Sequence, residues 1–169
     1  MTEINQPMRE LMQAVADELQ ANDMRLVTAE SCTGGMIAAA ITSFPGCSEW
    51  FEGGFVTYRL SAKTRMIGVR RETLDAHGAV SEPTAREMAE GALTASDAEI
   101  SVAVTGVAGP DGGNLLTPVG TVWFGWAVRA PDPVCVQTSR HAFSGNREQV
   151  RTQAVRIALD GVRRTLSGS

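Results

Sequence analysis

The chain has 169 residues, a length that suits one domain with a substantial hydrophobic core. Hydrophobic residues make up 43% and charged residues 20%, an ordinary globular mixture that excludes a largely disordered chain. The formal net charge is −4, which argues against a nucleic-acid-binding protein because such proteins usually carry an excess of Lys and Arg. An anionic small ligand would therefore be held by a few placed donors rather than by a general positive field.

The sequence also lacks the features of exported, membrane-bound and zinc-binding proteins. Segment 1–13 contains acidic residues and no apolar core of the kind found in secretory signals. No apolar run reaches the roughly 18 residues that a membrane span needs. The cysteines are widely spaced, at Cys32, Cys47 and Cys135, which favours reduced thiols and does not match a zinc site. We therefore expect a cytoplasmic protein without a metal, a cofactor, a nucleic-acid partner or a membrane anchor.

Apolar spacing predicts alternating helices and strands in the first third of the chain. A first helix begins at Pro7 and buries one stripe, made up of Met8, Leu11, Met12, Val15 and Leu19. A strand over 25–29, a buried helix over 36–41 and a second strand over 54–58 are predicted to follow.

Helices dominate the prediction for the middle of the chain. Ser61 is expected to cap a helix that ends near Gly68, and a short helix is expected over 72–77. Ser81 is expected to cap a longer helix with an inward face of Ala85, Met88, Ala89, Ala92 and Leu93.

The last third of the chain predicts strands and a closing helix. Strands are expected over 100–105, 121–129 and 134–142, and the short connection between the last two implies an antiparallel hairpin. The closing helix spans 147–166, with Val150, Ala154, Ile157, Ala158 and Val162 facing inward. The pattern predicts a single-domain, three-layer α/β/α sandwich around a mixed β-sheet over residues 1–169. Ligands bind beyond the strand ends in such sheets.

A serine follows the first predicted strand at the turn into a helix. In the segment from Glu30 to Gly35, Ser31 could project its hydroxyl beside free backbone N–H groups. On this segment alone, a helix-capping role for Ser31 or Thr33 is the favoured interpretation. Cys32 is a rival nucleophile because thiols are more reactive than hydroxyls, but the role of a small buried hydrophobe suits it better.

A lysine near the start of a helix is a second candidate. With Ser61 as the cap, Lys63 lies in the first helical turn, where the helix dipole and nearby Arg59 and Arg65 disfavour its ammonium form. A lysine of lowered pKa can act as a general base, and Tyr58 could orient it or relay a proton. A solvated surface lysine is the favoured interpretation of this segment alone.

Two further segments could hold an anion. Four glycines over 105–113 follow a buried strand and leave backbone N–H groups free, and Thr105 could bind a substrate there. A plain turn-rich connection explains this loop equally well. Arg147 stands where the last helix begins, so a phosphate could contact helix amides and a guanidinium together. On this segment alone, a surface arginine is the slightly favoured interpretation. His77 and His141 are expected to be structural.

Several segments together resemble the CinA carboxy-terminal domain family. They are, in chain order, 29–35, 54–58 with 62–63, 78–82, 106–113, 118–124 and 143–147. The resemblance runs from about Met8 to about Leu166 with the segments in family order. It implies an α/β/α fold, no metal, a homo-oligomer and, as in the stand-alone members, hydrolysis of nicotinamide mononucleotide to nicotinate mononucleotide and ammonia.

The resemblance also assigns roles to individual residues. It implies Ser31 as the nucleophile, Lys63 as the general base and Tyr58 as an assisting group. The expected substrate-binding residues are Glu30, Thr33, Gly34, Gly35, Thr105, Gly106, Gly109, Gly112, Gly113 and Arg147. The chain departs from the family at Arg59 and Leu60, where members often carry Ser-Asn, and this change bears on how the substrate is positioned.

Two other functions are compatible with the residues. A non-catalytic module that senses a pyridine nucleotide would use the same glycine loop and arginine without needing Ser31 or Lys63. A partner-binding domain in DNA uptake or repair is less favoured, because the chain is acidic and lacks an aromatic and basic surface pattern.

Overall fold

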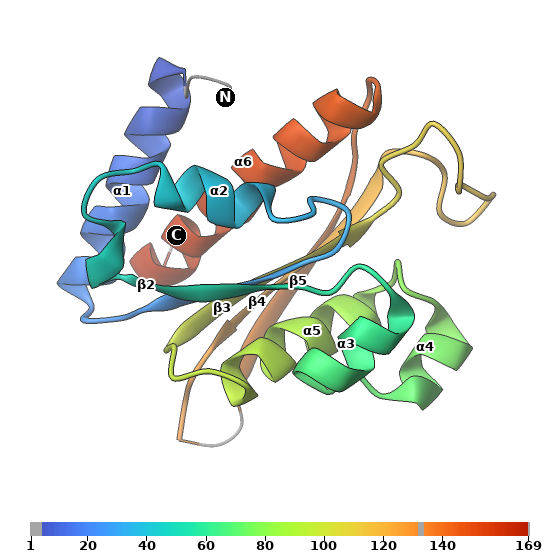
Figure 1. Ribbon diagram of the computed structural model, residues 1–169, viewed down its shortest axis with the longest axis horizontal. Helices are drawn as coiled ribbons and strands as arrows, with labels where there is room; N and C mark the ends of the chain where they lie inside the picture. Colours follow the sequence, from blue (N-terminus) through green and yellow to red (C-terminus); the bar gives the residue numbers. More distant parts are fainter. Residues whose placement is uncertain (1–4, 132–133, 169) are drawn as a thin grey trace.

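The computed structural model describes residues 5–131 and 134–168, which form one five-stranded sheet with helices on both faces (Figure 1). This arrangement confirms the predicted α/β/α sandwich. The elements follow one another as α1 (Gln6–Ala21), β1 (Leu26–Glu30), α2 (Met36–Thr42), η1 (Cys47–Glu49), β2 (Phe51–Val56), α3 (Leu60–Ile67), α4 (Arg71–His77), α5 (Glu82–Thr94), β3 (Ile100–Gly106), β4 (Thr121–Val128), β5 (Cys135–Ala142) and α6 (Arg147–Ser167).

The strand order brings the carboxyl ends of three parallel strands together, with β1 in the middle of the three. The order is β2-β1-β3-β4-β5, in which β1 runs parallel to both β2 and β3. β4 is antiparallel to β3, and β5 is antiparallel to β4, which confirms the predicted hairpin. Parallel strands end at the same edge of a sheet, so the carboxyl ends of β1, β2 and β3 meet there. In open α/β sheets a ligand crevice typically lies outside such an edge, where the chain leaves to both sides.

Two helical layers bury the sheet. Figure 1 shows α1, α2 and α6 on one face and α3, α4 and α5 on the other. Successive residues of β1 alternate between the two cores: Leu26 joins the cluster on the α1 and α6 side, and Val27 joins the cluster on the α5 side. Since both faces are covered, all of β1 is buried and its apolar residues do not alternate with exposed polar ones.

Helix starts agree with the sequence prediction at α5 but differ at α3. The Ser81 side chain accepts a hydrogen bond from the Thr84 N–H, as expected for the cap of α5. The prediction that Ser61 caps α3 is wrong, because the N-cap residue is Arg59. The Lys63 N–H already bonds the Arg59 carbonyl oxygen at 3.1 Å, so the helix begins before Ser61.

The second strand lies a few residues earlier than predicted. β2 spans Phe51–Val56, and a glycine pair within it pairs with β1, Gly53 opposite Val27 and Gly54 opposite Thr28. A Cβ at Gly54 would come within 2.5 Å of the Thr28 hydroxyl oxygen, so close packing requires glycine there. The turn between β4 and β5 includes residues 132–133, which lie outside the described residues. No helix in the described part of the chain is long and apolar enough to cross a membrane.

Candidate active site

Ser31 lies at the carboxyl end of β1. Its N–H donates to the Val104 carbonyl oxygen of β3 at 3.0 Å, while the preceding Glu30 carbonyl accepts from the Thr57 N–H at 2.8 Å. The turn is therefore fixed from both neighbouring strands. The Ser31 side chain is nearly buried, with 8% of the residue exposed.

Lys63 reaches from α3 to this serine. Its Nζ lies 2.8 Å from Ser31 Oγ and 2.6 Å from the Thr57 carbonyl oxygen, and the residue is completely buried. Sequence reasoning favoured a surface position for this lysine on its segment alone, and the structure instead buries it. The two residues that the resemblance implies as nucleophile and base are brought into contact.

The environment of Lys63 lowers the pKa of its side-chain amine. Burial lowers the pKa of Lys63 to about 8, and the Cys32 thiol acts weakly in the opposite direction. The cause differs from the one expected from the sequence, which was the helix dipole and neighbouring arginines. With a pKa near 8, a minor but sizeable fraction of Lys63 is neutral at pH 7 and available as a base.

The Glu30 carboxylate organises the start of α2. The residue is completely buried, and its two oxygens accept hydrogen bonds from the N–H groups of Gly35, Ile37 and Ala38 at 2.9–3.1 Å. A carboxylate here complements the positive end of the helix. The structure thus directs Glu30 at the helix amides, and the expected contact with substrate stays a prediction.

The turn after Ser31 contains two buried backbone N–H groups that donate to no other described residue. The Gly34 N–H bonds the Ser31 carbonyl at 3.1 Å, and the Gly35 N–H is held by Glu30. Among the described residues, the N–H groups of Cys32 and Thr33 donate to no other residue, and the Cys32 N–H contacts its own thiol. Oxyanion donors near Thr33 to Gly35, or at Gly106, stay a prediction; within the turn, the N–H groups of Gly34 and Gly35 already have acceptors. The Thr33 hydroxyl is also buried and unpaired among the described atoms.

Cys32 belongs to the core rather than to the reactive edge. The residue is 5% exposed and packs in the cluster on the α1 and α6 side of the sheet. Burial raises the pKa of the Cys32 thiol to about 11, so it stays protonated near neutral pH. A protonated thiol is a poor nucleophile, which favours Ser31 over Cys32.

Tyr58 and Arg147 form a contact at the rim of this edge. The Tyr58 side chain is exposed, and its hydroxyl oxygen accepts from Arg147 Nη2 at 3.3 Å. Lys63 Nζ meets the Tyr58 backbone carbonyl, also at 3.3 Å, rather than the phenol. The catalytic assistance expected of the Tyr58 hydroxyl stays a prediction, while its carbonyl helps to orient the lysine.

Arg147 forms hydrogen bonds to both the glycine-rich loop and Tyr58. It is the first residue of α6, which begins with a capping box formed by Asn146 and Gln149. Its Nη1 donates to the Gly109 carbonyl oxygen at 2.9 Å. Gly109 and Gly112 have φ angles of +84° and +92°, in the left-handed region that favours glycine. Arg147 therefore connects this loop to Tyr58.

Other residues of this loop have structural tasks in the described contacts. The Thr105 hydroxyl donates to the Ala79 carbonyl oxygen at 2.7 Å, and the residue is 1% exposed. A Cβ at Gly106 would lie 2.8 Å from the Thr121 carbonyl oxygen, and one at Gly113 would lie 2.6 Å from the Val119 nitrogen. Substrate contacts by Thr105, Gly106 and Gly113 stay predictions.

One residue of the site was missed in the sequence. Arg151 donates from Nε to the Cys32 carbonyl and from Nη2 to the Thr33 carbonyl, both at 3.1 Å. The available signal was its spacing from Arg147, since residues four apart share one face of a helix.

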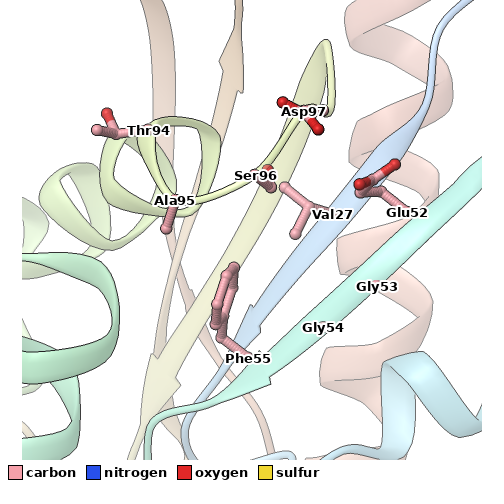
Figure 2. Close-up of a pocket in the computed structure, with 9 residues that line it drawn as sticks. All are labelled: Val27, Glu52, Gly53, Gly54, Phe55, Thr94, Ala95, Ser96 and Asp97. Carbon is pink, nitrogen blue, oxygen red and sulfur yellow. The ribbon is translucent and has the colours of Figure 1, made fainter.

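The cavity in Figure 2 lies away from Ser31. It has a volume of about 530 Å³ and opens beside β2 and the end of α5, with Glu52 and Asp97 at its wall. Val27 and Gly53, which also line it, lie toward the amino-terminal halves of their strands. Two carboxylates make this cavity unsuitable for an anionic ligand, and none of the predicted site residues lines it. No cluster of three or more metal-ligating side chains occurs in the part of the chain that is described.

Comparison with known proteins gives a consistent result. The model of the CinA C-terminal domain matches residues 8–166. Nicotinamide-nucleotide amidohydrolase PncC of Escherichia coli K12 is 52% identical over 150 residues, which cover 89% of each chain. The Pseudomonas putida protein of the same name is 47% identical over 92% of this chain and 95% of its own. A crystal structure of a CinA superfamily protein from Klebsiella pneumoniae superposes with a TM-score of 0.89 at 42% identity, covering 96% of this chain and 99% of that one. The chain belongs to the CinA C-terminal domain family.

Proposed function

We propose that this protein is an amidohydrolase that converts nicotinamide mononucleotide to nicotinate mononucleotide and ammonia. The names of its relatives in Escherichia coli and Pseudomonas putida support the reaction. The observation that carries the proposal is the 2.8 Å contact between Lys63 Nζ and Ser31 Oγ, because it joins a nucleophile to a base of lowered pKa.

The first half of the reaction forms an acyl-enzyme. Neutral Lys63 accepts the proton of the Ser31 hydroxyl as Oγ attacks the carboxamide carbon. The resulting oxyanion accepts hydrogen bonds from the N–H groups of Cys32 and Thr33, which donate to no other described residue. Protonated Lys63 then gives its proton to the departing nitrogen, so ammonia leaves and an ester to Ser31 remains.

The second half of the reaction releases the acid. Lys63, neutral again, takes a proton from water, and the hydroxide attacks the ester carbon. Collapse of this second tetrahedral intermediate returns the proton to Ser31 Oγ and frees nicotinate mononucleotide. No step needs a metal or a cofactor, since the lysine moves every proton.

The rim residues suit the nucleotide end of the substrate. Arg147 stands at the first turn of a 21-residue helix and beside the glycine-rich loop, where it can pair with a phosphate. We assign the phosphate to Arg147 and to the N–H groups around Gly109 and Gly112, and the pyridine ring to the space beside Tyr58. We also expect a cytoplasmic protein that forms a homo-oligomer. Light scattering of the purified protein tests the oligomeric state.

Ammonia release from nicotinamide mononucleotide by chelator-treated protein tests the proposal. We expect stoichiometric formation of ammonia and nicotinate mononucleotide. Binding of the nucleotide without ammonia release would instead favour the sensing module. Absence of both would overturn the assigned substrate and direct attention to Arg59 and Leu60, which replace the family's common Ser-Asn.

A further inference from the structure

Arg151 holds the turn that follows Ser31 from behind. It projects from α6 and bonds two successive carbonyl oxygens, those of Cys32 and Thr33, across 119 and 118 residues of sequence. Arg151 is partly buried in this contact. A guanidinium presents its donors in a rigid planar fork, so it can fix two carbonyls at once in a way that a single ammonium cannot.

The carbonyl that Arg151 holds determines the direction of a reactive donor. A trans peptide is planar, so its C=O and the following N–H point in opposite directions. The Cys32 carbonyl and the Thr33 N–H belong to the same peptide plane. Because Arg151 fixes the Cys32 carbonyl on one side, the Thr33 N–H must face the other side. This N–H donates to no other described residue, and Thr33 is completely buried.

The neighbouring glycine indicates how closely the guanidinium approaches the turn. Gly34 has a φ angle of +58°, and a Cβ built there would lie 3.3 Å from Arg151 Nη2. A side chain at position 34 would therefore press on the arginine and also strain the backbone. Glu30 restrains the other end of the turn through the Gly35 N–H. The turn is thus held at both ends by side chains from other elements.

We propose that Arg151 is a positioning residue that aims the Thr33 N–H at the developing oxyanion of the substrate. The guanidinium also polarises the peptide it bonds, which strengthens the opposite N–H as a donor. In the described contacts Arg151 bonds the turn and not Ser31 Oγ, so the proposed role is exerted through the turn. The proposal rests on the proposed amidohydrolase function, because only that reaction places an oxyanion at this point.

Four variants separate this role from others, among them Arg151→Ala, which leaves a cavity that added methylguanidinium can fill. Arg151→Met keeps an unbranched apolar stem and removes all the donors, whereas Arg151→Lys keeps the charge but loses the fork. Arg156→Met is the matched control, since Arg156 is an exposed residue one turn further along α6. Steady-state ammonia release from nicotinamide mononucleotide is measured for each variant and for the unmodified protein.

We expect Arg151→Met to lower kcat by about 10²-fold, the size of effect seen when one oxyanion donor is lost, with KM within about threefold. Arg151→Lys should retain an intermediate kcat, and Arg156→Met should match the unmodified protein. Binding of the product, nicotinate mononucleotide, should weaken by less than threefold in Arg151→Met, because its planar carboxylate spreads the negative charge over two oxygens, whereas the tetrahedral intermediate concentrates it on one. Added methylguanidinium should restore part of the kcat of Arg151→Ala.

A merely structural role would give a different pattern. Equal losses in kcat and in product affinity, with no rescue by methylguanidinium, would overturn the positioning role, as would a kcat within threefold of the unmodified value. Should Arg151→Met fail to fold, the kcat and product affinity of Arg151→Lys decide by the same criteria. An inactive unmodified protein would overturn the proposed function, and this inference with it, whereas active protein and fully active Arg151 variants would overturn this inference alone.

Discussion

Lys63 Nζ lies 2.8 Å from Ser31 Oγ, although 32 residues separate the two in the sequence. The contact depends on the sheet, because Ser31 follows β1 and the chain reaches α3 directly after the neighbouring strand β2. The Thr57 carbonyl, which follows β2, supplies the second hydrogen bond to Lys63. Parallel pairing of β1 and β2 therefore brings a nucleophile and a base together at one edge.

Activity should depend on pH through Lys63. Its pKa is lowered to about 8, and the base must be neutral to accept the Ser31 proton. We expect kcat/KM to rise about tenfold per pH unit below pH 8 and to level off above about pH 9. Initial rates of ammonia release between pH 6 and 10 measure this dependence. A profile that is flat across this range would contradict the role of Lys63 as base.

The free energy of unfolding should also depend on pH through Lys63, and it should rise with pH. Because the pKa of Lys63 is lower in the folded protein than its ordinary value, the unfolded chain binds more protons between about pH 8 and 10.5. The free energy of unfolding should therefore rise with pH across this window, by about 3 kcal/mol in total. Urea unfolding of the unmodified protein and of Lys63→Met at several pH values isolates this contribution. If the difference in free energy of unfolding between the unmodified protein and Lys63→Met does not change with pH, the lowered pKa of Lys63 is refuted.

Replacing Cys32 should affect stability but not chemistry. Cys32 is 5% exposed, and its thiol has a pKa of about 11, so it supplies packing rather than a nucleophile. We expect Cys32→Ala to lose about 1–2 kcal/mol of stability through the small cavity it leaves, and to keep kcat within threefold. Thermal unfolding and ammonia release are measured on the same preparation. Loss of activity in a folded Cys32→Ala protein would identify the thiol as the nucleophile.

Arg147→Ala should weaken recognition of the substrate phosphate. A guanidinium–phosphate pair at a helix start contributes about 1.5–3 kcal/mol, so KM for nicotinamide mononucleotide should rise about 10- to 100-fold. Nicotinamide riboside, which lacks the phosphate, is the matched control substrate. Its kcat/KM should be the same for Arg147→Ala and the unmodified protein. An equal loss on both substrates would show that Arg147 acts elsewhere, for example through Tyr58.

The fold followed from local patterns that the structure bears out. Apolar spacing indicated the inward residues of α5, and all five of those predicted are buried: Ala85, Met88, Ala89, Ala92 and Leu93. The prediction that Ser81 caps α5 is also confirmed, because capping depends on neighbouring residues alone. β2 was misplaced because its two glycines contribute no side-chain pattern, and only their close packing on β1 defines them as strand.

The site was harder to predict than the fold. The burial of Lys63 is a tertiary property: the residue looks like any surface lysine in sequence, and only the packing of α3 against the sheet encloses it. Glu30 and Arg151 bond backbone groups, and such contacts leave no motif in the sequence. The resemblance to a family identified Ser31 and Lys63 as a pair, whereas spacing and composition gave each of them a plainer role.

Ser31→Ala is the decisive variant for the nucleophilic role of Ser31, because it removes one oxygen from a nearly buried position and leaves Lys63 and the turn in place. Ammonia release from nicotinamide mononucleotide is measured under single-turnover conditions, with circular dichroism and thermal unfolding to verify the fold. We expect a rate at least about 10³-fold below that of the unmodified protein, with nucleotide binding retained. A folded Ser31→Ala protein that releases ammonia within tenfold of the unmodified rate would contradict a covalent mechanism through Ser31.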